Sequence, residues 1–327
     1  MNARELLLSI ASGEAAEGFL AAAVTSPLTA ELVNACGSSW PIVHRDSDSM
    51  ARAAVAAKSM FELENVRAPF DQCVEAEALG AELSFEGYYP RVKRFIEDIG
   101  SFDFFGKGRT EVVVEAVRRL RKAVGEGTPV LAGVTGPFTV LGYLFGPTRL
   151  MLSCRRTPSA VVATSQRLSA AIADYASELV SAGADAVVIE DMASSPDVLN
   201  PSIFRSVEVE PLRALTSRLG APCILHICGD TSSIVGDLPK TGVKVFHIDP
   251  KTNLEVVRAR APEIPLAGGV DTMLLLRGTP EEVSKTAVAC ARLGIRIIAP
   301  ACALHPRTPS GNVKAMARAV RGFCQLS

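Results

Sequence analysis

The feature that most constrains the fold is a unit that recurs along the chain. Each unit is a short run of β-branched and other apolar residues, then a turn, then a segment with helical periodicity. Eight such runs can be counted, the first being the weakest: 19–24, 66–70, 130–134, 186–190, 223–227, 243–248, 265–268 and 295–299. Strands that alternate with helices in this number are typical of a parallel barrel. We therefore predict an α/β fold, a single (β/α)8 TIM barrel domain over residues 1–327 with an N-terminal helical extension.

The segments between these runs support the same fold. Strong helical patterns cover 110–124, 159–182, 201–219 and 280–293, and several begin with Thr-Pro or Asn-Pro, where a capping side chain precedes a proline at the first helical position. Residues 86–108 are too long for a simple connection. We expect them to form an excursion over the mouth of the barrel.

Composition and charge exclude several classes of protein. Hydrophobic residues make up 48% and charged residues 21% of the chain, which is enough apolar material for a core. The 34 Lys and Arg residues are balanced by 35 Asp and Glu residues, so we expect no nucleic-acid partner. No uninterrupted apolar run reaches the roughly 18–20 residues that span a bilayer, and no export signal is evident. We therefore expect no membrane partner. The eight cysteines are few for a chain of this length, which argues for free thiols, so we expect a cytoplasmic protein.

The sharpest chemical signal lies at the ends of two predicted strands. His226 and Cys228 are two residues apart, so both can project to one side of a strand, and Cys302 follows the last predicted strand. One imidazole and two thiolates are zinc ligands, and three protein ligands at a barrel mouth leave a position open for a substrate. The alternative from spacing alone is a buried histidine with two ordinary core cysteines. The remaining histidines, 44, 247 and 305, are interpreted as structural or solvent-facing.

Further candidate residues follow other strands. As catalytic candidates we take the acidic residues Asp71, Glu190, Asp191 and Asp249. Gly136 opens a helix in the segment 133–139, where backbone amides can meet an anionic group, and Asp271 follows the seventh strand; both are taken as cofactor-binding candidates. The competing interpretations are helix caps for the acidic residues and a plain tight turn for Gly136.

An ordered set of motifs resembles a known family over nearly the whole chain. The motifs lie at 65–71, 74–80, 136–139, 195–197, 226–229, 268–271 and 300–302. Together they resemble the uroporphyrinogen decarboxylase superfamily, and within it the methylcobamide:thiol methyltransferases that methylate coenzyme M. The resemblance implies a (β/α)8 barrel in which His226, Cys228 and Cys302 bind Zn²⁺. The site also resembles that of the cobalamin-independent methionine synthases, which have a fourth, acidic ligand, and the resemblance makes Asp249 a candidate for a fourth ligand or for a partner in the outer shell.

The resemblance also implies a reaction. Zinc deprotonates a bound thiol, and two cysteine ligands keep the bound sulfur nucleophilic. The methyl group then moves from methyl-Co(III) of a corrinoid to the sulfur and leaves Co(I). No histidine here belongs to an Asp-x-His-x-x-Gly motif, so we expect the methylcobamide on a partner corrinoid protein.

The acceptor and the branch of the family leave alternatives open. We expect a small-molecule acceptor, a polar thiol such as coenzyme M, with Arg67 and Arg91 available for its acid group. The alternatives are tetrahydrofolate as acceptor, or a decarboxylase-like enzyme. The decarboxylases share an arginine-rich segment after the first strand, whereas residues 23–27 of this chain contain no arginine. A purely structural zinc protein is a third possibility.

Overall fold

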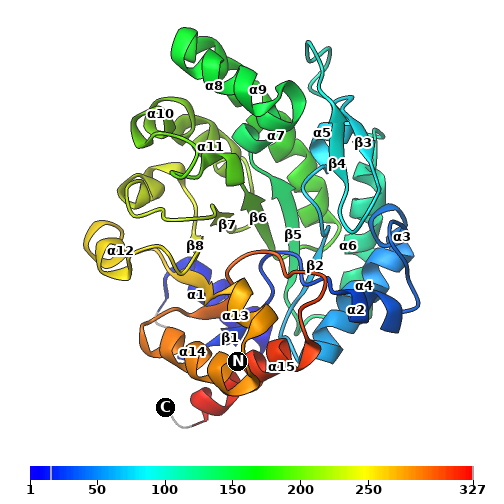
Figure 1. The fold of residues 1–327 in the computed structure, drawn as a ribbon, viewed down its shortest axis with the longest axis vertical. Coiled ribbons are helices and arrows are strands. Elements are labelled where there is room, and N and C mark those ends of the chain that lie inside the picture. Colours follow the sequence, from blue (N-terminus) through cyan, green and yellow to red (C-terminus); the bar gives the residue numbers. More distant parts are fainter. Residues whose placement is uncertain (15–16, 326–327) are drawn as a thin grey trace.

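Eight parallel strands form the centre of the molecule. The computed structural model describes residues 1–14 and 17–325. Neighbouring strands follow the order β1-β10-β9-β8-β7-β6-β5-β2. Their bounds are Leu20–Ala21 (β1), Val66–Ala68 (β2), Val130–Thr135 (β5), Ala186–Glu190 (β6), Cys223–His226 (β7), Val245–Ile248 (β8), Leu266–Val270 (β9) and Ile297–Pro300 (β10). All eight coincide with the predicted runs, and the curled sheet inside its ring of helices confirms the predicted (β/α)8 barrel (Figure 1).

Helices surround this sheet. They are α1 Ala3–Ser12, α2 Ala30–Ala35, α3 Ile42–Arg45, α4 Ser47–Phe61, α5 Val74–Ala78, α6 Thr110–Val124, α7 Pro137–Phe145, α8 Pro147–Arg156, α9 Pro158–Ser181, α10 Pro201–Val207, α11 Val209–Thr216, α12 Leu254–Arg260, α13 Thr272–Arg277, α14 Pro280–Arg292 and α15 Ser310–Cys324, with short 3-10 turns at Met192–Ser194 and Val235–Thr241. No helix in the described part of the chain has the length and apolar character needed to cross a membrane.

One predicted helix is divided in two. The periodic segment 201–219 forms α10 and α11, which meet at Glu208. Pro211 explains the break, because proline lacks the amide hydrogen and its ring clashes with the carbonyl four residues earlier, here that of Val207. The chain therefore kinks and turns the Glu208 side chain into the interior, where it is fully buried.

The barrel closes between β1 and β2 mainly through side chains. Glu64 accepts a hydrogen bond from the Ala21 amide at 2.6 Å and donates its own amide to the Ala21 carbonyl at 2.9 Å. Asn65 accepts from the Ala23 amide at 2.8 Å and donates to the Ala23 carbonyl at 2.9 Å. The two residues before β2 thus join the first and second strands of the barrel.

The two ends of the barrel are covered differently. At the amino ends of the strands, Leu7 and Ile10 of α1 pack into the same cluster as lumen residues such as Val188 and Ile297, so α1 plugs that end. At the carboxyl ends, β3 (Glu82–Ser84) and β4 (Arg91–Arg94) form an antiparallel hairpin that begins before the predicted excursion and extends into it (Figure 1). Tyr89 from this hairpin reaches the loops after β1 and β10.

Candidate metal centre

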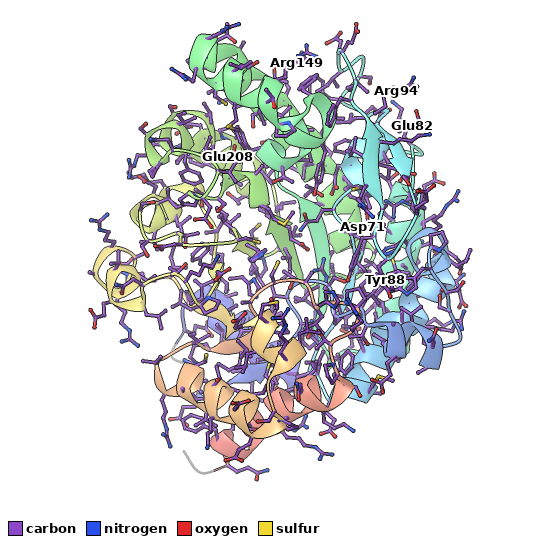
Figure 2. All side chains as sticks on the ribbon, viewed as in Figure 1. Asp71, Glu82, Tyr88, Arg94, Arg149 and Glu208 are labelled. Atoms are coloured by element: carbon purple, nitrogen blue, oxygen red, sulfur yellow. The ribbon has the colours of Figure 1, made fainter. Side chains whose placement is uncertain are left out.

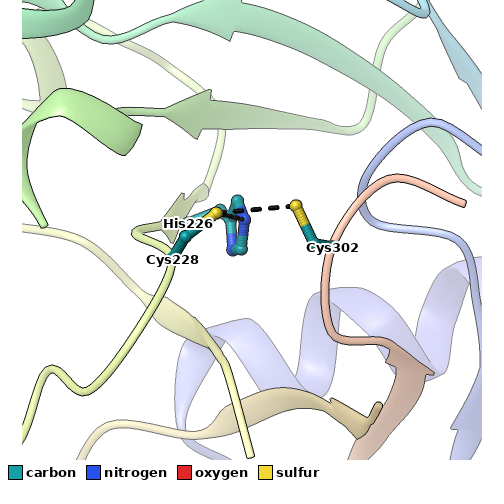
Figure 3. A group of neighbouring side chains, drawn as sticks. All are labelled: His226, Cys228 and Cys302. Atoms are coloured by element: carbon teal, nitrogen blue, oxygen red, sulfur yellow. Dashed lines mark hydrogen bonds between the residues drawn. The ribbon is translucent and has the colours of Figure 1, made fainter. Parts of the chain in front are cut away.

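Three potential ligands meet at the carboxyl ends of β7 and β10. His226 is the last residue of β7, Cys228 lies two residues further, and Cys302 lies two residues beyond β10. His226 Nε2 is 3.1 Å from Cys228 Sγ, and Cys228 Sγ is 3.5 Å from Cys302 Sγ (Figure 3). The three donor atoms all lie within 4.8 Å of one another. Two parallel strands of the ring therefore bring together residues that are 76 and 74 positions apart in the chain.

The electrostatics of the cluster favour one thiolate. A hydrogen bond from the Cys228 thiol, reinforced by His226 and opposed by burial, lowers the pKa of Cys302 to about 5. The same hydrogen bond and burial raise the pKa of Cys228. Burial lowers the pKa of His226, but its interactions with the Cys302 thiolate outweigh burial and raise it overall. One imidazole and two sulfurs, one of them readily ionised, form the donor set that suits a zinc ion.

The lumen beside this cluster holds a buried ion pair. Glu190 ends β6 in register with His226. Its carboxylate accepts hydrogen bonds from Arg67 Nη2 at 2.7 Å and from Gln72 Nε2 at 2.5 Å. A side chain at Gly133 would overlap the Arg67 guanidinium, so this glycine makes room for the pair. Glu190 is thus the predicted acidic residue that lies in the lumen beside the three ligands.

Asp71 belongs to a separate buried network. It receives two hydrogen bonds from Arg109, at 2.8 and 3.0 Å, and its carboxylate lies 3.1 Å from His44 Nδ1. Burial would raise the pKa of Asp71, but the Arg109 and His44 interactions lower it far below the ordinary range. Its position beside the hairpin of Tyr88 (Figure 2) matches a role in holding the excursion onto the barrel, because His44 also contacts the Tyr88 carbonyl.

Asp191 and Gly136 together form a helix start. Asp191 accepts hydrogen bonds from the Thr139 amide at 2.8 Å and the Thr139 hydroxyl at 2.6 Å, in the first turn of α7. A Cβ atom at Gly136 would overlap the Asp191 side chain. The amides that we expected to meet an anionic ligand are therefore capped by a carboxylate of the protein itself.

Asp249 and Asp271 occupy turns at their strand ends. Asp249 accepts from the Gly229 amide at 3.2 Å and from the Lys251 amide at 3.0 Å, so its carboxylate lies beside the loop that carries Cys228. Asp271 caps α13 by accepting from the Met273 amide at 2.9 Å. Neither carboxylate belongs to the three-residue cluster of close donor atoms that the described residues form.

Sequence reasoning missed the neighbours of the site. His247 is fully buried against His226, so it is not one of the solvent-facing histidines. Its position in register with His226 on the next strand was the signal that could have revealed it. Gln72 had no such signal, because its contact with Glu190 joins residues 118 positions apart.

Comparisons with known proteins show the family and the fold. The family model described as uroporphyrinogen decarboxylase (URO-D) matches residues 2–323. The methylcobamide:CoM methyltransferase MtaA of Methanosarcina barkeri is 29% identical over 325 residues, covering 96% of each chain. A uroporphyrinogen decarboxylase of Anaeromyxobacter sp. is 26% identical over 300 residues, covering 85% of this chain and 86% of the relative. A solved structure, a methyltransferase from Methanosarcina mazei, superposes with a TM-score of 0.94 at 29% identity and covers 99% of each chain.

Proposed function

This chain belongs to the uroporphyrinogen decarboxylase family, and we propose that it transfers a methyl group from a methylated corrinoid protein to a small thiol with the help of zinc. The expected resemblance to the methylcobamide:thiol branch is confirmed, and the chain is a methyltransferase. The observation that carries the more specific proposal is the convergence of His226, Cys228 and Cys302 within 4.8 Å.

The donor set explains how an acceptor thiol is activated. An ordinary thiol with a pKa near 8.5 is mostly protonated at neutral pH, and the thiolate is the nucleophile. Zinc, when bound, lowers the pKa of a coordinated thiol. His226, Cys228 and Cys302 would hold the ion and leave one position for the acceptor sulfur. The two cysteine ligands offset the charge of the ion, so the acceptor sulfur keeps its nucleophilic character.

Methyl transfer then needs a donor in line with that sulfur. The sulfur forms a bond to the methyl carbon while the cobalt–carbon bond breaks, and the electron pair stays on cobalt, which passes from Co(III) to Co(I). The methyl donor would approach from the carboxyl ends of the strands, where the three ligands lie. The role of the protein in this step is to hold the acceptor and to keep the lumen charges paired, as Arg67 and Glu190 do.

We propose coenzyme M or a similar small acidic thiol as the acceptor. Relatives named as methylcobamide:CoM methyltransferases support this choice. Arg67 supports it as well, because its Nε is buried and has no hydrogen-bond partner among the described residues. Arg91 lies exposed on β4 of the hairpin and is the weaker candidate for the acid group. All eight cysteines are free thiols, so we place the enzyme in the reducing cytoplasm.

Metal analysis and a spectral assay test the proposal. We expect about one zinc per chain in the purified protein, and loss of zinc in H226A, C228A and C302A. The matched control is C223A, at the opposite end of β7, which should keep its zinc. Methylcob(III)alamin should be converted to cob(I)alamin when coenzyme M is added. Zinc-loaded protein that gives no thiol-dependent spectral change, but binds tetrahydrofolate tightly in a calorimeter, would refute the choice of acceptor.

A further inference from the structure

A second histidine lies against the predicted zinc ligand His226. His247 of β8 is in register with His226 of β7, both are 0% exposed, and their ring centroids are 4.6 Å apart. His226 Nδ1 is 2.8 Å from His247 Nδ1 and 3.2 Å from the His247 carbonyl oxygen. His247 Nε2 is 3.0 Å from the carbonyl oxygen of Pro300 in β10. The pair therefore links three strands of the barrel.

The two carbonyl groups determine where the ring protons lie. A carbonyl oxygen only accepts hydrogen bonds, so the nitrogen that faces it must carry a proton. His247 Nε2 therefore donates to Pro300, which leaves Nδ1 of a neutral His247 as an acceptor. His226 Nδ1 faces one carbonyl and this acceptor, so it carries the proton. The Nε2 atom of His226 then keeps its lone pair, and that atom is the one beside Cys228 and Cys302.

We propose that His247 is a positioning residue that fixes the tautomer and the ring orientation of His226 for metal binding. The proposal rests on the proposed zinc function. His247 is not a ligand itself, because both of its ring nitrogens are engaged. Its bond to Pro300 also ties His226 to the strand that carries Cys302 two residues later. The His247 side chain thereby holds the His226 imidazole at a fixed distance from the strand that leads to Cys302.

Gly268 makes space for this arrangement. A Cβ atom there would lie 3.1 and 3.2 Å from two ring atoms of His247, and 2.5 Å from the Ile248 carbonyl oxygen. Gly268 also has a φ of +99°, a conformation that other residues rarely adopt. The backbone of β9 therefore leaves a pocket that the His247 ring fills.

Two substitutions at His247 separate positioning from mere packing. H247L replaces the ring by an apolar side chain and removes both of its hydrogen bonds, so His226 Nδ1 keeps only the 3.2 Å contact with the carbonyl oxygen of residue 247. H247Q retains one donor and one acceptor. Loss of a partner that orients a metal-bound histidine typically weakens metal binding by about 10–100-fold. We expect a loss of that size in H247L, and partial recovery in H247Q, when zinc affinity is measured by competition with a chelator. The control H305L alters a histidine whose ring accepts from the Arg307 amide, and it should bind zinc as the wild type does.

The tautomers themselves give a second readout on the full-length wild-type chain. The chain has four histidines, so ¹⁵N-labelled imidazole signals can be assigned with single variants. We expect protonated Nδ1 in His226 and protonated Nε2 in His247, with or without zinc. A wild type that binds no zinc would refute the metal centre. The tautomers would still show whether His247 fixes the protonation of His226. Protonated Nε2 and bare Nδ1 in His226, or unchanged zinc affinity in folded H247L, would overturn the proposal.

Discussion

The buried carboxyl pair of Asp191 and Glu208 predicts an unusual dependence of stability on pH. Both side chains are 0% exposed, and the Glu208 side chain (labelled in Figure 2) interacts with that of Asp191. Asp191 accepts its hydrogen bonds from Thr139, whereas neither oxygen of Glu208 meets a donor among the described residues. We therefore expect Glu208 to carry a proton and to donate a hydrogen bond to Asp191. Burial and the Asp191 carboxylate, together with nearby Cys154, raise the pKa of Glu208 well above its ordinary value.

The sign and size of the effect follow from proton linkage. Glu208 keeps its proton in the folded protein at a pH where the unfolded chain, with a pKa near 4.3, has lost it. Raising the pH therefore favours unfolding, and the stability that the proton secures declines from about pH 4.3 up to the folded pKa. One proton corresponds to a slope of about 1.4 kcal/mol per pH unit. Between these two pKa values the free energy of unfolding should thus fall by up to about 1.4 kcal/mol for each pH unit because of Glu208.

The substitution E208Q removes the titration and keeps a donor toward Asp191. Urea unfolding of wild type and E208Q at several pH values above about pH 5 should show the variant gaining stability relative to wild type as the pH rises, by up to about 1.4 kcal/mol for each pH unit. The control E210Q changes an exposed glutamate on α11 that pairs with Arg213, and its pH profile should parallel that of wild type. Parallel profiles for wild type and E208Q would refute the assignment of a proton to Glu208.

Two further substitutions test the networks around the barrel mouth by urea unfolding. R109M leaves Asp71 buried without its guanidinium partner, so we expect a loss of about 3–5 kcal/mol, whereas R118M on the exposed face of α6 should change stability by less than about 1 kcal/mol. A loss in R109M no larger than that of its control would contradict the Asp71 network. G136A inserts a methyl group into the space of Asp191 and should lower the free energy of unfolding by about 1–3 kcal/mol. The control G220A, whose new Cβ atom would contact nothing within 4 Å, should cause no such loss. Equal effects of the two substitutions would argue against the packing of Asp191 on Gly136.

The barrel and its three-ligand cluster were predictable because local patterns determine them. All strands of a parallel barrel end at the same face, so residues just beyond β7 and β10 lie at the same mouth of the barrel. The spacing of His226 and Cys228 places both on one side of the strand. These rules need no knowledge of distant contacts.

The roles of the acidic residues depended on contacts that no local pattern reveals. Glu190 and Asp191 are adjacent, and strand alternation sends one into the lumen and the other outward to α7. The choice between them is made by partners that come from elsewhere: Arg67 for Glu190, and Thr139 with Glu208 for Asp191. Sequence alone marks such residues as strand-end acids and stops there.

At the joint between β1 and β2, a single amino-acid substitution can remove the hydrogen bonds that close the barrel. The other seven joints are ladders of main-chain hydrogen bonds, which any amino acid except proline supports. At the β1–β2 joint, the carboxamide of Asn65 offers the same donor and acceptor as a peptide unit and stands in for one. Substitutions at residues 64 and 65, whether natural or engineered, can therefore open the barrel between β1 and β2. Circular permutants with new termini at these residues would interrupt the barrel where its closure depends least on main-chain hydrogen bonds.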